Sequence, residues 1–233
     1  MTSFDLIAFD ADDTLWHTES LYVNVQGKLK ELLAPYHEPE WVEARLYETE
    51  MRNLKVYGYG IKSFTLSMIE TAIELTEGRI SGREIQSILN LAKEMVSADI
   101  QLLPHVAEAI PQLAARTPLM IITKGDLLDQ EAKIAKSGLG SYFRYVEIVS
   151  SKTRTTYETI LNRHGIPPER FLMVGNSLPS DILPVLEMGG HGVHIPYHIT
   201  WAHESAEPPT NHPHFRQLEH LGSLPHLVQS LTP

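Results

Sequence analysis

The sequence predicts an α/β fold, in which a doubly wound parallel sheet is interrupted by an all-helical insertion. Short apolar runs typical of strands alternate with helical segments from Pro104 to Pro196. Such alternation is typical of a parallel sheet with helices on both faces. One further strand-like run, Phe4–Phe9, precedes a long segment with few strand signals, from Trp16 to about Ala98. The insertion therefore splits the sheet domain in sequence.

The first predicted strand ends in an acidic turn. Phe4–Phe9 is followed directly by Asp10, Ala11 and Asp12. Side chains at positions i and i+2 of a strand point to the same face, so Asp10 and Asp12 can face one substrate. Gathered carboxylates are costly unless a cation neutralises them or a proton is shared. With oxygen ligands and no cysteine in the chain, Mg2+ fits this turn better than Zn2+.

The long middle segment predicts helices. Four helical stretches are expected, at Ser20–Leu33, Pro39–Leu54, Ile61–Leu75 and Ser81–Val96. Ser81 followed by Glu84 fits a capping box, and apolar residues from Ile85 onward recur at helical spacing. We expect the insertion to end between Asp99 and Pro104, before a helix at about His105–Ala115.

Three later strand-like runs each deliver a polar residue suited to phosphate or metal chemistry. The run at 118–123 ends in Thr123, and Lys152 follows the run at 145–151. A third run, beginning at Phe171, leads into Gly175-Asn176-Ser177 and then Asp181. Ligands bind at the carboxyl ends of the strands in open parallel sheets, so these residues are expected to converge there with Asp10 and Asp12.

Taken in order, these four motifs resemble those of the haloacid dehalogenase-like hydrolases. The family pattern is Asp-x-Asp-x-Thr after a strand, then a Ser or Thr, a Lys, and Gly-(Asp/Asn)-Ser with a trailing Asp. The resemblance implies a Rossmann-like core, formed here by residues 1–16 and 99–233, and a helical cap formed by residues 17–98. The cap closes over the catalytic face in such proteins and selects the substrate.

The resemblance also implies roles for individual residues. Asp10 would be the nucleophile and Asp12 the general acid and base, with Thr123 and Lys152 completing the catalytic set and holding the transferring phosphoryl group. Lys124, beside Thr123, is a further candidate for substrate binding, although it could equally be a solvated loop lysine.

The implied metal site takes Mg2+ through the Asp10 carboxylate, the Asp12 backbone carbonyl, Asn176 and Asp181. Asp181 would be either a direct ligand or a residue behind the ligands. Two positions depart from the commonest family pattern: Asp13 stands where Gly is usual, and Thr153 follows Lys152 where Pro is frequent. Neither removes a group that the chemistry needs, and we interpret Asp13 as a structural turn residue.

The predicted activity is Mg2+-dependent hydrolysis of a small phosphate monoester through an aspartyl-phosphate. A phosphomutase would keep the same core residues, whereas family members that act as 2-haloacid dehalogenases typically lack the second acidic residue, present here as Asp12. A binding protein of the same fold without catalysis is the least favoured alternative, because no core group is missing. The substrate and the oligomeric state stay open at this point.

The charge composition and the hydrophobic pattern of the sequence exclude some classes of partner. A formal net charge of -10 and the lack of a basic run argue against nucleic acid, whose phosphates need clustered Lys and Arg. No stretch reaches the roughly 20 apolar residues that cross a bilayer, so we expect a cytoplasmic protein that acts on a small phosphorylated metabolite. The histidines at 191, 194 and 198 do not predict a metal site. Residues three apart on a strand face opposite sides, and the Gly- and Pro-containing segment is not expected to be helical.

Overall fold

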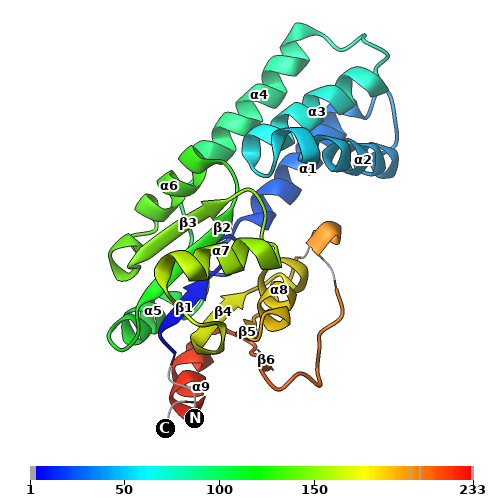
Figure 1. Ribbon diagram of the computed structural model, residues 1–233. Coiled ribbons are helices and arrows are strands. Elements are labelled where there is room, and N and C mark those ends of the chain that lie inside the picture. Colours follow the sequence, from blue (N-terminus) through cyan, green and yellow to red (C-terminus); the bar gives the residue numbers. More distant parts are fainter. Residues whose placement is uncertain (1–3, 200, 205, 232–233) are drawn as a thin grey trace. The chain divides into compact units, whose positions relative to one another are not determined.

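The computed structural model describes residues 4–199, 201–204 and 206–231 (Figure 1). In these ranges one sheet contains six strands in the order β3-β2-β1-β4-β5-β6, and every neighbouring pair is parallel. The strands are β1 (Leu6–Phe9), β2 (Leu119–Lys124), β3 (Tyr145–Val149), β4 (Phe171–Gly175), β5 (His191–His194) and β6 (Phe215–Gln217). The α/β fold with a parallel sheet is therefore confirmed.

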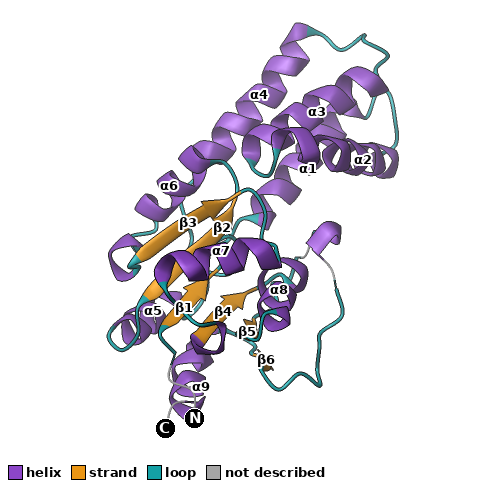
Figure 2. Ribbon diagram, viewed as in Figure 1, coloured by secondary structure: helices purple, strands orange, loops and turns teal. Residues whose placement is uncertain are grey.

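Helices cover both faces of this sheet (Figure 2). They are α5 (Val106–Ala114), α6 (Leu127–Lys136), α7 (Arg154–His164), α8 (Leu183–Glu187) and α9 (Leu224–Leu231). Alternate side chains of β1 enter different cores: Ile7 and Phe9 pack in one cluster with residues of α5 and α9, and Leu6 and Ala8 in another with residues of α7 and α8. This alternation follows from the period of two in a strand and makes the sheet doubly wound.

The chain divides into two compact units. The first contains the chain up to Glu19, Ile100–Lys124 and the chain from Glu131 onward, and it includes the sheet. The second contains Ser20–Asp99 and Gly125–Gln130.

The second unit is built on the predicted helical insertion. Its helices are α1 (Glu19–Leu33), α2 (Pro39–Tyr57), α3 (Ile61–Leu75) and α4 (Gly82–Ser97). They enclose a core of their own, to which Leu29, Met68 and Ile88 contribute fully buried side chains. The expected capping box is present at the start of α4, where Ser81 accepts the Glu84 N–H at 3.3 Å and Glu84 accepts the Ser81 N–H at 2.7 Å.

The strand order reverses direction at β1. The chain moves outward from β1 through β2 to β3, and then returns to place β4 on the other side of β1. Phe9 at the end of β1 is in register with Ile121 of β2 and Val174 of β4. The residues that follow these strands consequently lie at one edge of the sheet, at the switch point where open α/β sheets bind ligands.

Candidate active site

The nucleophile candidate meets a buried ion pair at this edge. Asp10 follows β1 and its N–H still donates to the Val174 carbonyl of β4, at 2.9 Å. The Lys152 ammonium donates to Asp10 Oδ1, and to Asp181 Oδ1 at 2.7 Å. The side chains of Lys152 and Asp181 are each 1% exposed. Three predicted site residues from separate motifs are thus brought into direct contact.

Asp181 accepts a hydrogen bond at each of its two carboxylate oxygens. It lies in a π-helical turn, η3 (Leu178–Ile182), and its Oδ2 accepts the Ser177 N–H at 3.0 Å. A Cβ atom at Gly175 would lie 2.2 Å from Asp181 Oδ2, so only glycine leaves room for this carboxylate. The glycine of the fourth motif is therefore required by the position of Asp181, which in turn fixes Lys152.

The Asn176 side chain faces oxygen atoms. Its amide oxygen lies 3.2 Å from Asp10 Oδ2 and 3.3 Å from the Asp12 carbonyl oxygen. The Thr14 hydroxyl lies 3.1 Å from the same amide oxygen and 3.3 Å from Asp10 Oδ2. Acceptors that face one another repel, so this arrangement needs either an amide turned to donate through its nitrogen or a cation among the oxygens. Carboxylate, carbonyl and amide oxygens are the ligands that Mg2+ takes in proteins, so the donor set fits this ion.

Negative charge exceeds positive charge in this part of the sheet edge. Burial raises the pKa of Asp10 to about 7, with Lys152 opposing the shift and Asp181 adding to it. Burial also raises the pKa values of Asp13 and Glu19 to about 7. Two carboxylates sharing the Lys152 ammonium leave a net negative charge, which a divalent cation would neutralise.

A metal here would need oxygens beyond the acidic side chains. Across the described residues, no three His, Cys, Asp or Glu side chains form a group that could hold a metal ion. The Asp12 carbonyl and the Asn176 amide would therefore have to complete the site.

The Asp12 carboxylate is oriented by side chains from its own turn and from α6. Its Oδ1 accepts from Trp16 Nε1 and from Thr18 Oγ1, each at 2.8 Å. The Lys133 ammonium of α6 donates to both carboxylate oxygens at 3.1 Å. Sequence reasoning did not identify Lys133, because a lysine on an amphipathic helix is more often part of a solvated face, whereas Lys133 is buried.

Asp13 adopts a conformation that explains the glycine usual at its position. Its φ of 60° lies in the left-handed region, which favours glycine but which Asp also tolerates. The Asp13 carboxylate accepts the N–H of Thr18 at 2.8 Å and that of Glu19 at 3.0 Å, at the start of α1. In this chain Asp therefore gives the turn a helix-capping side chain that glycine lacks.

Thr123 and Lys124 lie at the end of β2 in different settings. Thr123 is 1% exposed, and its hydroxyl makes a long contact of 3.4 Å with the Lys124 carbonyl. The Lys124 ammonium donates to Ser180 Oγ at 2.8 Å and to Glu204, in the short 3-10 turn η4 (Ala202–Glu204). Glu204 also accepts the hydroxyls of Ser177 and Ser180.

Glu204 carries a stable negative charge beside these groups. Burial opposes its charged form, but Lys124 and the two serine hydroxyls outweigh burial and lower its pKa. Sequence reasoning missed Glu204 because it lies in a tail segment that has no motif. Lys124 is consequently placed at the sheet edge with its charge engaged by a carboxylate.

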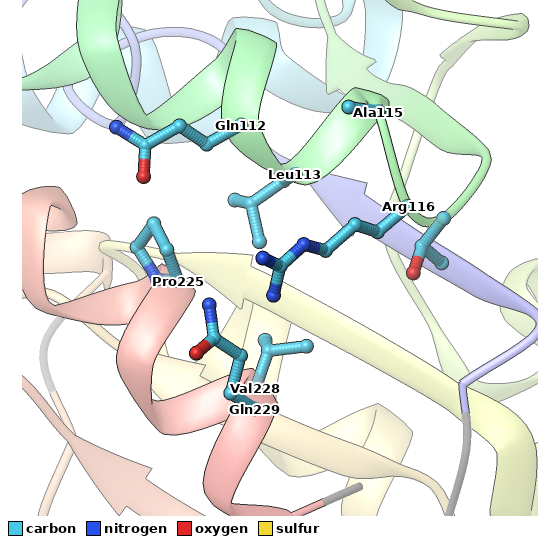
Figure 3. A pocket seen from close by; sticks show the side chains of 8 residues that line it. Gln112, Leu113, Ala115, Arg116, Pro225, Val228 and Gln229 are labelled. Carbon is cyan, nitrogen blue, oxygen red and sulfur yellow. The ribbon is translucent and has the colours of Figure 1, made fainter.

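A pocket of about 230 Å3 lies elsewhere, between α5 and α9 (Figure 3). Gln112, Arg116 and Gln229 contribute polar groups to its lining. Thr117, which also lines it, precedes β2, whereas Thr123 lies near the other end of that strand. At about 3.3 Å per residue, Thr117 and Thr123 are roughly 20 Å apart, so this pocket is separate from the candidate active site.

Comparison with known protein families shows to which of them this chain belongs. Residues 4–189 match the model described as hydrolase, haloacid dehalogenase-like hydrolase. The chain belongs to the haloacid dehalogenase-like hydrolases. A haloacid dehalogenase-like family hydrolase of Xanthomonas campestris is 40% identical, with a TM-score of 0.89 over 98% of this chain and 92% of that one. The resemblance stated from the motifs is therefore confirmed, and so is the helical insertion typical of this fold.

More distant solved structures share the fold. The 2-haloacid dehalogenase of Pseudomonas syringae pv. tomato is 20% identical, with a TM-score of 0.65 over 98% of this chain and all of that one. YfnB of Bacillus subtilis, a putative HAD hydrolase bound to magnesium, is 17% identical, with a TM-score of 0.68 over 97% of this chain and 99% of that one. A search of curated proteins gave no match.

The helices give no sign of a membrane segment. None of those in the described ranges combines the length and the apolar character that crossing a bilayer requires.

Proposed function

We propose that this hydrolase is a Mg2+-dependent phosphatase that cleaves a small phosphate monoester through an aspartyl-phosphate on Asp10. The observation that carries the proposal is the second carboxylate, Asp12, held by Lys133, Trp16 and Thr18 in the turn that follows Asp10. A 2-haloacid dehalogenase releases a halide, which needs no proton, whereas an alkoxide leaving group does. An oriented second carboxylate therefore favours phosphate ester chemistry over dehalogenation.

In the first step an Asp10 carboxylate oxygen attacks the phosphorus in line. The new O–P bond forms as the bond from phosphorus to the ester oxygen breaks, and the leaving oxygen takes a proton from the Asp12 carboxyl group. The products are the free alcohol, a phosphorylated Asp10 and an Asp12 carboxylate. The covalent intermediate divides one difficult displacement into two easier ones.

In the second step water attacks the phosphorus of phosphorylated Asp10. Asp12 takes a proton from that water, the bond from phosphorus to the Asp10 oxygen breaks, and inorganic phosphate leaves. Asp10 and Asp12 return to their starting forms. One residue thus serves as acid and then as base, as reversal of the proton path requires.

Lys152 and Thr123 would hold the phosphoryl oxygens. Lys152 already contacts Asp10, and Thr123 lies on the strand beside β1, so both are at the edge where the phosphoryl group would be transferred. Positioning and charge stabilisation dominate phosphoryl transfer, and an ammonium and a hydroxyl supply both. Lys124 would contact a second polar group of the substrate, with Glu204 as its neighbour.

The Asp10 carboxylate, the Asp12 carbonyl and the Asn176 amide oxygen would hold Mg2+. Bound there, the ion neutralises negative charge between the carboxylate and the phosphate dianion. Asp181 has both oxygens engaged, by Lys152 and by the Ser177 N–H, so we propose that it acts mainly by positioning Lys152. The magnesium-bound YfnB, which shares the fold, supports the choice of ion.

Hydrolysis of p-nitrophenyl phosphate tests this function. We expect turnover by the wild type with Mg2+ and none with excess chelator. Asp10→Asn should abolish turnover, and Asp12→Asn should lower it by about 100-fold or more. Asp99→Asn, which changes an exposed acid, is the matched control. Absence of wild-type turnover with this ester and with a panel of metabolite phosphates, together with halide release from 2-haloacids, would overturn the proposal.

A further inference from the structure

We propose that Lys133 is a positioning residue, which holds Asp12 in place to accept the proton of the attacking water when phosphorylated Asp10 is hydrolysed. This inference rests on the phosphatase function proposed above. It assigns to α6, a helix without any of the four motifs, a part in the second step of the reaction.

Lys133 contacts both oxygens of the Asp12 carboxylate, and we call this contact the Lys133 clamp. Lys133 Nζ lies 3.1 Å from each oxygen of the Asp12 carboxylate, so the ammonium sits symmetrically across the group. Trp16 and Thr18 bind Oδ1 alone. The terminal torsion of an Asp side chain has a broad energy profile, so the group turns easily unless it is held. A donor that spans both oxygens opposes this rotation, which donors on a single oxygen do less well.

Lys133 is also the one charged donor among these three. All three bonds have the Asp12 carboxylate as acceptor, but only Lys133 adds the attraction between opposite charges, so it is expected to contribute more than Trp16 or Thr18. The side chains of Lys133 and Asp12 are 11% and 25% exposed, so solvent screens this pair less than it screens a fully exposed one. The contact is therefore a strong one in a sheltered position.

The part of α6 that carries Lys133 is anchored in the apolar core of the sheet domain. Ile134, the next residue of α6, is 8% exposed and belongs to the same apolar cluster as Phe9 and Ile121. Phe9 immediately precedes Asp10, so one packed cluster supports both the turn that carries Asp12 and the helix that carries Lys133. Side-chain packing, which resists small displacements, consequently sets the distance between the Lys133 ammonium and the Asp12 carboxylate.

The two chemical steps should depend differently on this clamp. With p-nitrophenyl phosphate the leaving group is stable as an anion, so formation of phosphorylated Asp10 needs little help from Asp12. Hydrolysis of the intermediate still requires a base aligned with the attacking water. Loss of Lys133 should then slow the second step selectively and let phosphorylated enzyme accumulate.

Rapid mixing of the enzyme and Mg2+ with p-nitrophenyl phosphate separates these steps, because p-nitrophenolate reports the first and inorganic phosphate the second. In Lys133→Met we expect phosphate release to slow by about 10- to 100-fold, part of the usual contribution of a general base. First-turnover release of p-nitrophenolate should change by less than about 3-fold, as a burst of nearly one equivalent per enzyme. In the steady state kcat should fall while kcat/KM is nearly kept.

Three further variants complete the test. Lys133→Arg keeps a charged fork and should restore most of the rate of phosphate release. Lys133→Gln keeps a neutral donor and should show the same selective slowing to a smaller degree. It replaces Lys133→Met as the test if that variant does not fold. Lys136→Met, an exposed lysine on the same helix, should match the wild type in both steps.

Other results would overturn the inference. If folded Lys133→Met or Lys133→Gln releases phosphate as fast as Lys136→Met, Lys133 does not position Asp12. If the rates of both steps fall together without a burst, its role is only structural. If the wild type releases neither product, the proposed function fails and the inference falls with it, whereas the first two results leave that function standing.

Discussion

Removal of Lys152 should destabilise the sheet domain strongly, independently of catalysis. The Lys152 ammonium contacts both Asp10 and Asp181, and its side chain is 1% exposed. Burial disfavours the ammonium, but the two carboxylates outweigh burial and raise the pKa of Lys152 above its ordinary value of 10.5. In Lys152→Met the two carboxylates would face one another without this counter-charge.

The size of the effect follows from the burial of the pair. Breaking a buried ion pair by removing one partner costs about 3–5 kcal/mol, because the other charge stays desolvated. Thermal midpoints of domains of this size shift by about 2–4 °C per kcal/mol, so we expect Tm to fall by about 6–20 °C. Replacing Asp181 with Asn in the same chain should recover at least about 1 kcal/mol, because one of the two unpaired charges is then removed.

Urea unfolding at pH 7 in the presence of a chelator measures this free energy. Lys136→Met serves as the control, and an exposed substitution of this kind should stay within about 0.5 kcal/mol of the wild type. A loss of less than about 1 kcal/mol in Lys152→Met would refute the reasoning. So would simple additivity of Lys152→Met and Asp181→Asn, since it would mean that the two side chains do not interact.

Substitutions at Gly175, Asp13 and His191 test local features. Gly175→Ala would place a Cβ 2.2 Å from Asp181 Oδ2, so turnover should fall about 100-fold, and unchanged kinetics would contradict this geometry. Asp13→Ala should cost about 1–2 kcal/mol in thermal unfolding and Asp13→Gly less, because glycine suits the φ of 60°; equal losses would argue against a strained turn. Burial and a neighbouring histidine lower the pKa of His191 from 6.5 to about 4. As the pH is lowered from 6.5 to 4, the unfolded chain binds a proton at this histidine before the folded chain does, so the free energy of unfolding decreases over that range. After discounting for partial exposure, His191→Gln should flatten that fall by about 1 kcal/mol, with His226→Gln, at an exposed histidine, as the control substitution.

The convergence of the motif residues at one edge of the sheet was predictable because each lies at or just after the end of a strand. Apolar runs that end in Asp10, Thr123 or Asn176 carry a strong local signal, and parallel pairing brings their carboxyl ends together. The resemblance to a known family then assigned roles that periodicity alone does not give. Helix α4 was predictable for a similar reason, since its capping box is readable from Ser81 and Glu84.

Contacts that depend on packing were not predictable. Lys133 lies on a helix whose buried face cannot be known before the helix is placed, and Glu204 reaches Lys124 from a distant tail segment. The turn at Asp13 is intermediate: sequence favoured a structural role, but the φ angle and the two backbone N–H groups that it accepts are properties of the folded chain. Long-range polar contacts of this kind leave no periodic trace in the sequence.

The central claim is that Asp10 carries the phosphoryl group, and mass spectrometry of the peptide that contains it tests this most directly. Asp12→Asn should be mixed with p-nitrophenyl phosphate and Mg2+ and quenched in acid, because slow hydrolysis in this variant lets the intermediate accumulate. We predict one phosphoryl group on Asp10 and none in the double variant that also carries Asp10→Asn. An unmodified Asp10 peptide during turnover, or a phosphoryl group on another residue, would contradict the mechanism.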